Sequence, residues 1–379
     1  MTYRLYGMPA SLYTAKARSY LLTQGVAFKE RTPGEAHFRE HIVPKLGRWI
    51  IPVLEGPDGA LVQDGSDIIA HLQSRGETRF SVYPATPRHA VIAQIFELFG
   101  GEGLLRPAMH FRWNFEAENR AFLAQDFPAA LTPPGSPADV RAAVFEQAAQ
   151  RMRKAMASFG VNAATIPAVE ASYGEFLRLF DAHLEGAPYL LGGRATIGDY
   201  ALIGPLGAHL GRDPYPAALM QQTAPRVWRW RERMHRPDRD AGEYGDAPEA
   251  LFAEDGVPDT LKALLRFVAE DYLPEVQAHV AFCNAWLAER PDLAPGSSGL
   301  ERTQERRIGQ TAFAWRGQEL RVGVMPYRLY LLQKVQDGAD HAPPEAEVSA
   351  LLEEVGLGDL LTLRTSRRIV RRNHLEVWA

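Results

Sequence analysis

Between residues 50 and 63 the sequence changes from apolar to polar and back within a few positions. Residues 50–54 (IIPVL) form a short apolar run, residues 56–59 (GPDG) are turn formers, and residues 60–63 (ALVQ) form a second short run. Two short runs joined by a turn of this composition predict a β-hairpin.

Pro52 interrupts the first strand of this hairpin. A proline cannot donate to a central ladder, so it is found at a strand end or a bend. A cis Ile51–Pro52 bond would turn the backbone N–H and C=O of Val53 outward. We therefore predict an open strand edge that can pair with a peptide-like ligand. A plain ββα unit without a ligand is the alternative.

A helix is expected directly after the hairpin, over residues 66–76. Asp64 and Ser66 offer side-chain oxygens to the free N–H groups of its first turn, and Ile68 and Leu72 follow at helical spacing. The free N–H groups and the partial positive charge of such a helix start suit a carboxylate.

The residues before the hairpin alternate between strand and helix patterns. Strands are expected near residues 3–6 and 27–32, and helices over residues 12–24 and 34–43. The resulting order, β-α-β-α-β-β-α, contains a strand-helix-strand half that should be parallel and right-handed, followed by a hairpin half.

Helical patterns dominate downstream. Helices are expected at residues 86–100, 138–159, 166–185 and 258–290. The last part of the chain mixes both patterns, with a hairpin at 311–322, helices near 326–336 and 345–356, and a strand-like stretch at 367–378.

Length and composition indicate a globular chain of several domains. At 379 residues the chain is too long for one core, and a prior of about 150 residues per domain suggests two or three domains. The 42 basic and 46 acidic residues give a net charge of −4, which argues against a nucleic-acid partner. We find no apolar run of about 18 residues that could span a membrane.

Cys283 is the single cysteine of the sequence. A single cysteine excludes an internal disulfide framework and fits a reducing, cytoplasmic compartment. The N-terminus leads straight into a strand pattern and does not resemble a signal peptide. The arginines within residues 364–372 are expected to be solvated or paired with acidic groups rather than to bind RNA.

Three segments within residues 11–72, SLYTAKAR, IPVL and QDGSDIIAHL, resemble the thioredoxin-fold domain of glutathione S-transferases. A second signal lies far downstream, where residues 189–202 (YLLGGRATIGDYAL) resemble the buried helix entry of the family's all-helical domain. There, Thr196 and Asp199 have the spacing of an N-terminal capping box, with Asp in place of Glu.

The resemblance implies the fold class and the domain organisation. We expect an α/β thioredoxin-like, glutathione-binding domain at residues 1–78, and an all-α domain for the second substrate at residues 86–240. Residues 241–295 are expected to add further helices, and residues 296–379 a C-terminal α+β extension of unknown role. Simple transferases of this family end before these last two segments.

The resemblance also implies where the thiol is activated. In the family, the activating group lies at the end of the first strand or the start of the first helix, which makes Ser11, Tyr13 and Tyr6 the candidates. Ser11 stands where redox members carry a nucleophilic cysteine, so mixed-disulfide chemistry is not expected here. Ser11 would instead donate a hydrogen bond to the sulfur of glutathione, with the two tyrosines as rival donors. An ordinary helix N-cap is the alternative role for Ser11.

Glutathione itself, as the co-substrate, would be held by the hairpin and the helix start after it. Val53, which follows Pro52, would pair through its backbone with the cysteinyl part of the tripeptide. Asp64 stands at the position that contacts the γ-glutamyl amine. Gly65 stands where a serine or threonine usually binds the γ-glutamyl carboxylate, with Ser66 one residue late.

Two further groups of residues follow from the resemblance. Arg48 and Trp49 lie where the family often holds the glycine carboxylate, although Arg48 is also readable as a surface charge. The pocket for the second substrate would be lined by Met109, His110, Arg112 and Trp113. Packing between the domains is the alternative role for the aromatic residues of this segment.

Two functions therefore compete. The first is a glutathione S-transferase-like enzyme that activates the glutathione thiol for attack on an apolar electrophilic small molecule. The second is a non-catalytic binding or scaffolding protein of the same fold, with the extension as its interaction module. No metal is expected, since His37 and His41 have no third ligand of suitable spacing. The family implies a homodimer, and the long C-terminal segment is able to cover the dimer surface.

Overall fold

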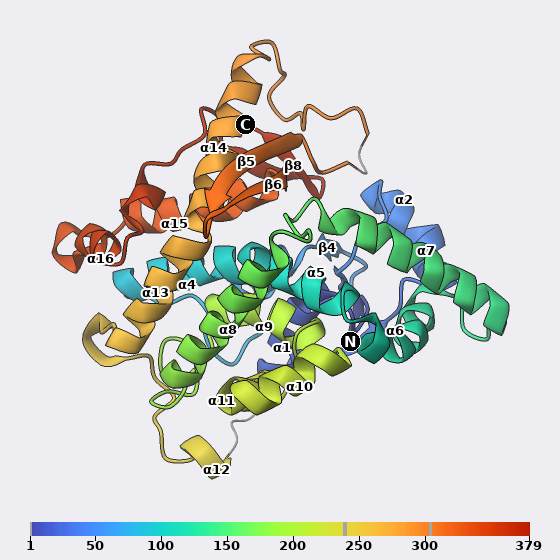
Figure 1. The fold of residues 1–379 in the computed structure, drawn as a ribbon, viewed down its shortest axis with the longest axis horizontal. Coiled ribbons are helices and arrows are strands. Elements are labelled where there is room, and N and C mark those ends of the chain that lie inside the picture. Colours follow the sequence, from blue (N-terminus) through green and yellow to red (C-terminus); the bar gives the residue numbers. More distant parts are fainter. Residues whose placement is uncertain (1, 238–240, 303–304) are drawn as a thin grey trace.

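The computed structural model describes residues 2–237, 241–302 and 305–379 (Figure 1). Its N-terminal part is a four-stranded sheet in the order β2-β1-β3-β4, in which β1 and β2 are parallel and the other neighbours antiparallel. The strands are β1 (Tyr3–Tyr6), β2 (Phe28–Arg31), β3 (Val53–Glu55) and β4 (Leu61–Gln63). The parallel half and the hairpin half predicted from the sequence are confirmed.

The helices of the thioredoxin-like part are α1 (Leu12–Thr23), α2 (Val43–Leu46) and α3 (Gly65–Ser74). Ser11 caps α1 and Asp64 caps α3 through their side chains, because each accepts a hydrogen bond from a first-turn N–H group. The helical segment expected over residues 34–43 is present, but it runs from residue 36 to residue 46. The segment is a π-helical turn at Phe38–Ile42 that runs into α2, where Pro44 has no N–H to continue an α-helical ladder.

An all-helical part follows. Its helices are α4 (Pro87–Leu98), α5 (Leu105–Trp113), α6 (Glu116–Leu131), α7 (Ala138–Met156), α8 (Ile166–His183), α9 (Ile197–Ala208), α10 (Pro214–Thr223) and α11 (Pro225–Arg233), with a π-helical turn at Phe99–Gly103 after α4. The thioredoxin-like and all-helical fold classes expected from the sequence are both present.

Helix α9 lies at the centre of the molecule, and every one of its residues is buried. Its start is closed by the predicted capping box, in which Asp199 accepts hydrogen bonds from the Thr196 N–H at 2.9 Å and the Thr196 hydroxyl at 3.1 Å. Asp199 also accepts from the Leu190 N–H and the Trp230 indole. Burial raises the pKa of Asp199 to about 6, so the carboxylate is ionised at pH 7 and can accept all four bonds.

The remaining residues form helices and two small antiparallel sheets. The helices are α12 (Ala241–Tyr244), α13 (Asp259–Asp271), α14 (Leu273–Ala288), α15 (Tyr327–Asp340) and α16 (Val348–Glu354), with short 3-10 turns at Ala253–Asp255, Pro344–Ala346 and Gly358–Leu361. The sheets are β5 (Gly309–Trp315) with β6 (Gln318–Val324), and β7 (Ile369–Arg372) with β8 (Leu375–Trp378).

Two sequence expectations for this region are corrected by the structure. The helical stretch 258–290 is two helices, because the backbone leaves the helical range at Tyr272 and Pro274 follows at once. The stretch 367–378 is a hairpin rather than a single strand. Asn373 and His374 both have positive φ, which is the conformation that a tight two-residue hairpin turn requires.

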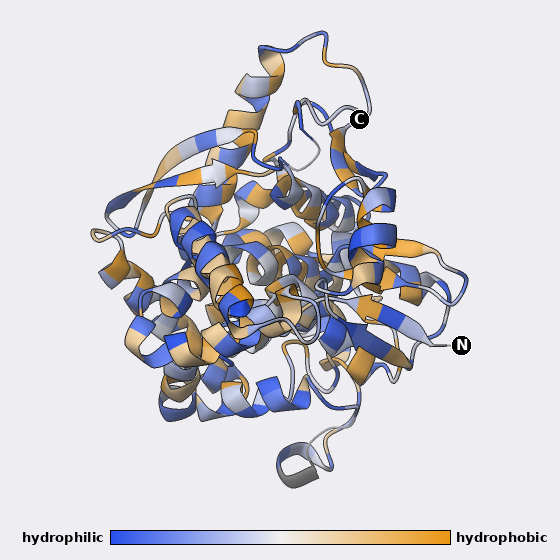
Figure 2. Ribbon diagram, turned by 90° about the vertical axis from the view of Figure 1, so that its right-hand side faces the viewer, coloured by the Kyte–Doolittle hydropathy of each residue, from blue (hydrophilic) through white to orange (hydrophobic). Residues whose placement is uncertain are grey.

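The C-terminal part does not stand apart from the rest. Helix α15 packs along α4 (Figure 1), and its buried residues Leu331, Leu332 and Val335 belong to the same hydrophobic core as Ile92 and Phe96 of α4. Figure 2 shows outer helices as alternating bands of hydrophilic and hydrophobic residues, as expected of helices with one buried face. Division of the chain at residues 78, 240 and 295 stays a proposal.

No helix within residues 2–237, 241–302 and 305–379 is both long and apolar enough to cross a membrane.

Replacement of Asp199 tests the contribution of the capping box at the N-terminus of α9. Asp199→Asn is expected to lower the free energy of unfolding by roughly 3 kcal/mol, because the new amide places N–H groups against donors that need an acceptor. Urea unfolding at pH 7 measures the change, with the exposed Asp292→Asn as the matched control. Equal stability of Asp199→Asn and the wild type would contradict this role of the capping box.

Candidate functional site

An apolar cavity of about 560 Å³ lies between the start of α1 and helices α5, α6 and α7. Among the predicted site residues, it is lined by Ser11, Tyr13, Trp49, Met109, Arg112 and Trp113. Its other walls are largely apolar side chains, among them Met8, Ile51, Phe127, Leu131, Met152 and Phe159. Such a volume and lining suit an apolar small molecule.

Ser11 lies at the N-terminus of α1 and is half-buried. Its Oγ accepts a hydrogen bond from the Thr14 N–H at 3.2 Å, so the predicted N-cap role is present. A serine hydroxyl can donate one bond while it accepts another. Ser11 therefore caps the helix and still has a proton to offer to a group in the cavity.

The two rival tyrosines are already engaged. Tyr13 lines the cavity, but its hydroxyl donates to Glu102 Oε1 at 3.1 Å. Tyr6 lies among the apolar residues packed around Phe38, where its hydroxyl donates to Glu55 Oε2 at 3.1 Å. Burial, together with the nearby carboxylate, raises the pKa of both phenols, to about 12 for Tyr6. Neither hydroxyl is placed to donate to a sulfur beside Ser11.

Arg112 is a positioning residue on the cavity wall. Its guanidinium makes a two-point pair with Asp213, through Nε at 2.6 Å and Nη2 at 3.0 Å. It also donates to the carbonyl of Ala10 at 2.8 Å, immediately before Ser11. Because a guanidinium only donates, the His209 Nε2 that it contacts at 2.8 Å must accept, which assigns the His209 proton to Nδ1.

The predicted substrate-pocket residues, which lie within residues 109–113, are on two sides of α5. Met109 and Trp113 line the cavity, whereas His110 lies on the other side of α5, with its Nε2 2.9 Å from Glu170 and its Nδ1 2.8 Å from Asn114. Two buried nitrogens of cavity-lining residues, Trp113 Nε1 and His209 Nδ1, have no hydrogen-bond partner within the described part of the chain.

The predicted γ-glutamyl end of the site has a different character. Asp64 Oδ1 accepts from the Ser66 N–H at 2.9 Å and from the hydroxyl of Tyr327, in α15, at 3.0 Å. The Ser66 hydroxyl lies 2.7 Å from Lys16 Nζ and donates to Glu97 at 2.6 Å. A side chain at Gly65 would put its Cβ 3.1 Å from Lys16 Cδ, so Lys16 takes up the room that a serine would need.

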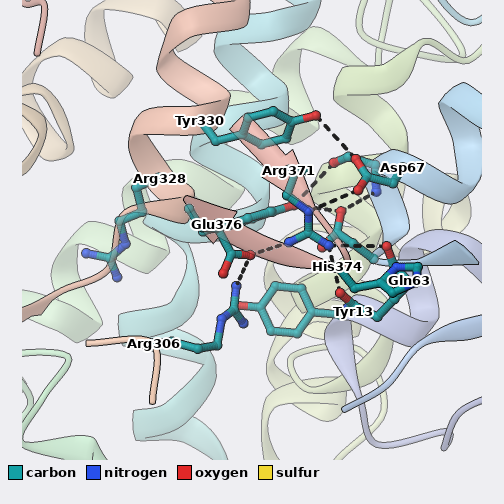
Figure 3. Close-up of polar contacts among 12 residues, drawn as sticks. Tyr13, Gln63, Asp67, Arg306, Arg328, Tyr330, Arg371, His374 and Glu376 are labelled. Carbon is teal, nitrogen blue, oxygen red and sulfur yellow. Dashed lines mark hydrogen bonds and ion pairs between the residues drawn. The ribbon is translucent and has the colours of Figure 1, made fainter. Parts of the chain in front are cut away.

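Arg371, in the β7–β8 hairpin, covers this end of the sheet (Figure 3). Its guanidinium donates to Gln63 Oε1 at 2.7 Å, to the Gln63 carbonyl at 3.3 Å, and to Asp67 Oδ2 at 3.0 Å. It also pairs with Glu376 of β8, and Glu376 in turn lies 3.3 Å from Arg306. The contacts of Arg371 with Gln63 and Asp67 join residues that are more than 300 positions apart in the sequence.

Arg48 is buried beneath the same hairpin rather than exposed at the surface. It donates to the carbonyl of His374, lies 3.9 Å from Glu376, and contacts Gln63 at 3.4 Å. Burial lowers the pKa of Arg48 to about 10. Trp49, by contrast, is half-exposed on the cavity wall.

The Ile51–Pro52 bond is cis, as anticipated. The open strand edge predicted at Val53 is wrong, because β3 is an inner strand of the sheet. Val53 is fully buried and is paired with Tyr6 on β1 and with Gln63 on β4. The Pro52 carbonyl accepts from the Asp64 N–H at 3.2 Å. Ile51, one residue before the proline, is the hairpin residue that reaches the cavity.

Sequence analysis missed the contributions of the C-terminal segment, namely Arg306, Tyr327, Arg328 and Arg371. The one available signal was the arginine cluster, whose acid-paired character is confirmed by Arg364 with Asp340 and by Arg368 with Asp337. Within the described residues there is no group of three or more His, Cys, Asp or Glu side chains placed to hold a metal ion.

Comparisons with known proteins add a family relationship. Residues 5–79 match the glutathione S-transferase N-terminal domain, and residues 163–233 match the glutathione S-transferase C-terminal domain. The matched regions thus leave out everything after residue 233. No match is found among the curated proteins.

Several solved structures are similar to this chain. One is a glutathione transferase from Phanerochaete chrysosporium, with 15% identity over 63% of this chain and 98% of that chain, and a TM-score of 0.44. A second is the β-etherase LigF of Sphingobium sp., with 17% identity, coverage of 62% and 95%, and a TM-score of 0.41. A third, from Methylobacterium radiotolerans in complex with glutathione sulfonate, has 20% identity, coverage of 68% and 100%, and a TM-score of 0.36.

The stability that the buried Glu97 carboxylate gives to this part of the fold depends on pH. Burial raises the pKa of Glu97, but Lys16 and Lys334 outweigh burial and lower it to about 2. A carboxylate with a depressed pKa stabilises the fold above its unfolded pKa, and that stability is lost as the pH falls toward 2. We expect Glu97 to contribute roughly 3 kcal/mol at pH 7.

Urea unfolding of the wild type and Glu97→Gln at pH 7 and pH 3 measures this contribution. The variant should be less stable at pH 7, and the difference should shrink at pH 3, whereas the exposed Glu345→Gln should follow the wild type at both values. A difference that is the same at both pH values would exclude the titration of Glu97 as its cause.

Proposed function

We propose, since this chain belongs to the glutathione S-transferase superfamily, that it stabilises a thiolate at Ser11 and directs it at an apolar electrophile held in the cavity of about 560 Å³. The thiol is that of glutathione. The observation that carries the proposal is the position of Ser11, at the N-terminus of α1 and on the wall of the cavity. The thiolate and the electrophile would meet there.

The energetics are adequate for this role. A thiol with an ordinary pKa of about 8.5 is only about 3% thiolate at pH 7. A fall of about two pKa units, worth about 2.7 kcal/mol, would make it mostly thiolate. One charge-assisted hydrogen bond from Ser11 supplies about 1.5–3 kcal/mol, and the end of α1 about 0.3–1 kcal/mol.

The lining of the cavity limits the kinds of electrophile that can bind. Apolar walls favour an electrophile with an apolar body. Attack by the thiolate on an electrophilic carbon forms a C–S bond, and the electron pair passes to a leaving group or an adjacent acceptor. Conjugation, dehalogenation, ether cleavage and isomerisation all begin with this step.

A second candidate function is a non-catalytic binding protein of the same fold. It is favoured by one observation, that Asp64, Gln63 and Arg48 already have partners from the C-terminal segment. In that case the cavity would bind an apolar molecule without thiol chemistry. A cytoplasmic location and a homodimer stay proposals, the latter testable by light scattering.

Replacement of Ser11 separates the two candidates. Ser11→Ala should lower kcat/KM for glutathione-dependent turnover about 10- to 100-fold, because the bond to the thiolate is lost. It should also raise the pKa of the bound thiol by about one to two units, read from thiolate absorbance against pH. Ser11→Thr keeps a hydroxyl and should restore part of the activity.

Ser136→Ala, in an exposed loop, is the control for the loss of a hydroxyl. Unchanged turnover and thiol pKa in Ser11→Ala would remove Ser11 from the chemistry. Absence of any glutathione-dependent turnover in the wild type, with an apolar ligand still bound, would favour the binding protein.

Blocking the cavity tests the second substrate site. Ala148→Trp places a large ring on the cavity wall, whereas Ala143→Trp places the same ring on an exposed side of α7. The first variant should weaken binding of anilinonaphthalene sulfonate, an apolar fluorescent probe, by about tenfold or more, and the second should not. Equal binding by both variants would place the probe outside this cavity.

A further inference from the structure

We infer that the tip of the β7–β8 hairpin, residues 371–376, is an internal ligand that occupies the γ-glutamyl end of the glutathione site and must be displaced before the tripeptide binds. The inference rests on the proposed function, since it takes glutathione as the thiol of this site. It concerns the contacts shown in Figure 3.

Arg371 supplies the cation of the internal ligand. The γ-glutamyl head carries an ammonium group, and the resemblance to the family places Asp64 as the receptor for that group. In the structure, Arg371 donates to Gln63 at 2.7 Å and to Asp67 at 3.0 Å, beside Asp64. A positive charge from the chain itself therefore stands where the positive charge of the ligand would bind.

Glu376 supplies the matching anion. Its carboxylate pairs with Arg371 and lies 3.3 Å from Arg306 and 3.9 Å from Arg48. Its side chain is nearly fully buried, and so is that of Arg371. An ammonium and a carboxylate attached to one carbon are the polar groups of an amino-acid head, and Arg371 with Glu376 presents the same two charges.

The hairpin is built so that its tip can move while its base stays. The base residues Ile369, Val377 and Trp378 are buried, and Trp378 is hydrogen-bonded to Ser297 through the backbone. The tip is different, since Arg372 and Asn373 are exposed. Helix α15 shares the main core and holds Arg328 in buried ion pairs, so it is expected to remain in place.

Exchange of the tip for the ligand is electrostatically balanced. The acidic groups would trade the Arg371 guanidinium for an ammonium, and Arg306 would trade the Glu376 carboxylate for the carboxylate of the γ-glutamyl head. Freed Arg371 and Glu376 would become hydrated, still as a pair. The apparent affinity for glutathione is then the intrinsic affinity reduced by the fraction of open molecules.

A double variant tests the internal ligand. Arg371→Gln with Glu376→Gln removes both charges of the pair without changing the net charge. Isothermal titration of the full-length protein with glutathione should show an affinity about tenfold or more above that of the wild type. Thermal unfolding followed by circular dichroism verifies that the variant is folded.

The matched control removes a comparable pair on the outer side of the hairpin. Arg368 pairs with Asp337 at 2.7 Å, and both side chains are about half exposed. Arg368→Gln with Asp337→Asn should therefore leave the glutathione affinity unchanged. In the wild type, saturating glutathione should speed amide hydrogen exchange at residues 371–376, measured on C-terminal peptides by mass spectrometry.

The inference is overturned if the folded double variant binds glutathione no better than the wild type, or if the wild type binds it without faster exchange at the tip. An equal gain in the control pair would also overturn it, because the effect would then be a general loosening. These measurements follow binding with Ser11 intact, so failure of thiol activation shows separately, as loss of the Ser11→Ala effect on turnover.

Discussion

Pairing of the buried carboxylate of Glu102 is the interaction on which the arrangement of this protein depends. Glu102 accepts from the Tyr13 hydroxyl at 3.1 Å and pairs with Arg328 at 3.0 Å, and Arg328 also pairs with Glu275. A buried charge without a partner costs several kcal/mol. Tyr13 of α1, Glu102 of the helical part and Arg328 of α15 therefore each need the others as partners. The C-terminal segment is thus integral to the fold.

The same need for partners explains the unusual polar end of the site. Lys16 extends past Gly65 to reach Glu97 and Ser66, so a Cβ at position 65 would lie in tight contact with it, 3.1 Å from Lys16 Cδ. Arg371 satisfies acceptors on Gln63 and Asp67. Gly65 departs from the family pattern, and so does the presence of the C-terminal segment. Both features belong to the same polar end of the site.

The start of α1 separates two environments. On one side, Ser11 opens onto an apolar cavity, and on the other, Tyr13 points into the network of charges around Glu102 and Arg306. Arg112 fixes the backbone just before this helix, because it donates a hydrogen bond to the Ala10 carbonyl. The open half of the site therefore favours apolar ligands, whereas the other half is occupied by charges of the chain itself.

The sequence by itself determined the elements whose causes are local. The hairpin around residues 56–59, the caps at Ser11 and Asp64, and the capping box of Thr196 with Asp199 each depend on side chains within a few positions, and all are present. The proline at position 52 marked a bend, and the structure decided that the Ile51–Pro52 bond is cis. Only the tertiary structure decided which side chains reach the cavity and which acceptors stay free. Tyr327 meets Asp64 across 263 positions, and Arg371 meets Gln63 across 308. No local pattern encodes such pairs, because they form only when burial brings charges from distant segments together and requires that each be matched.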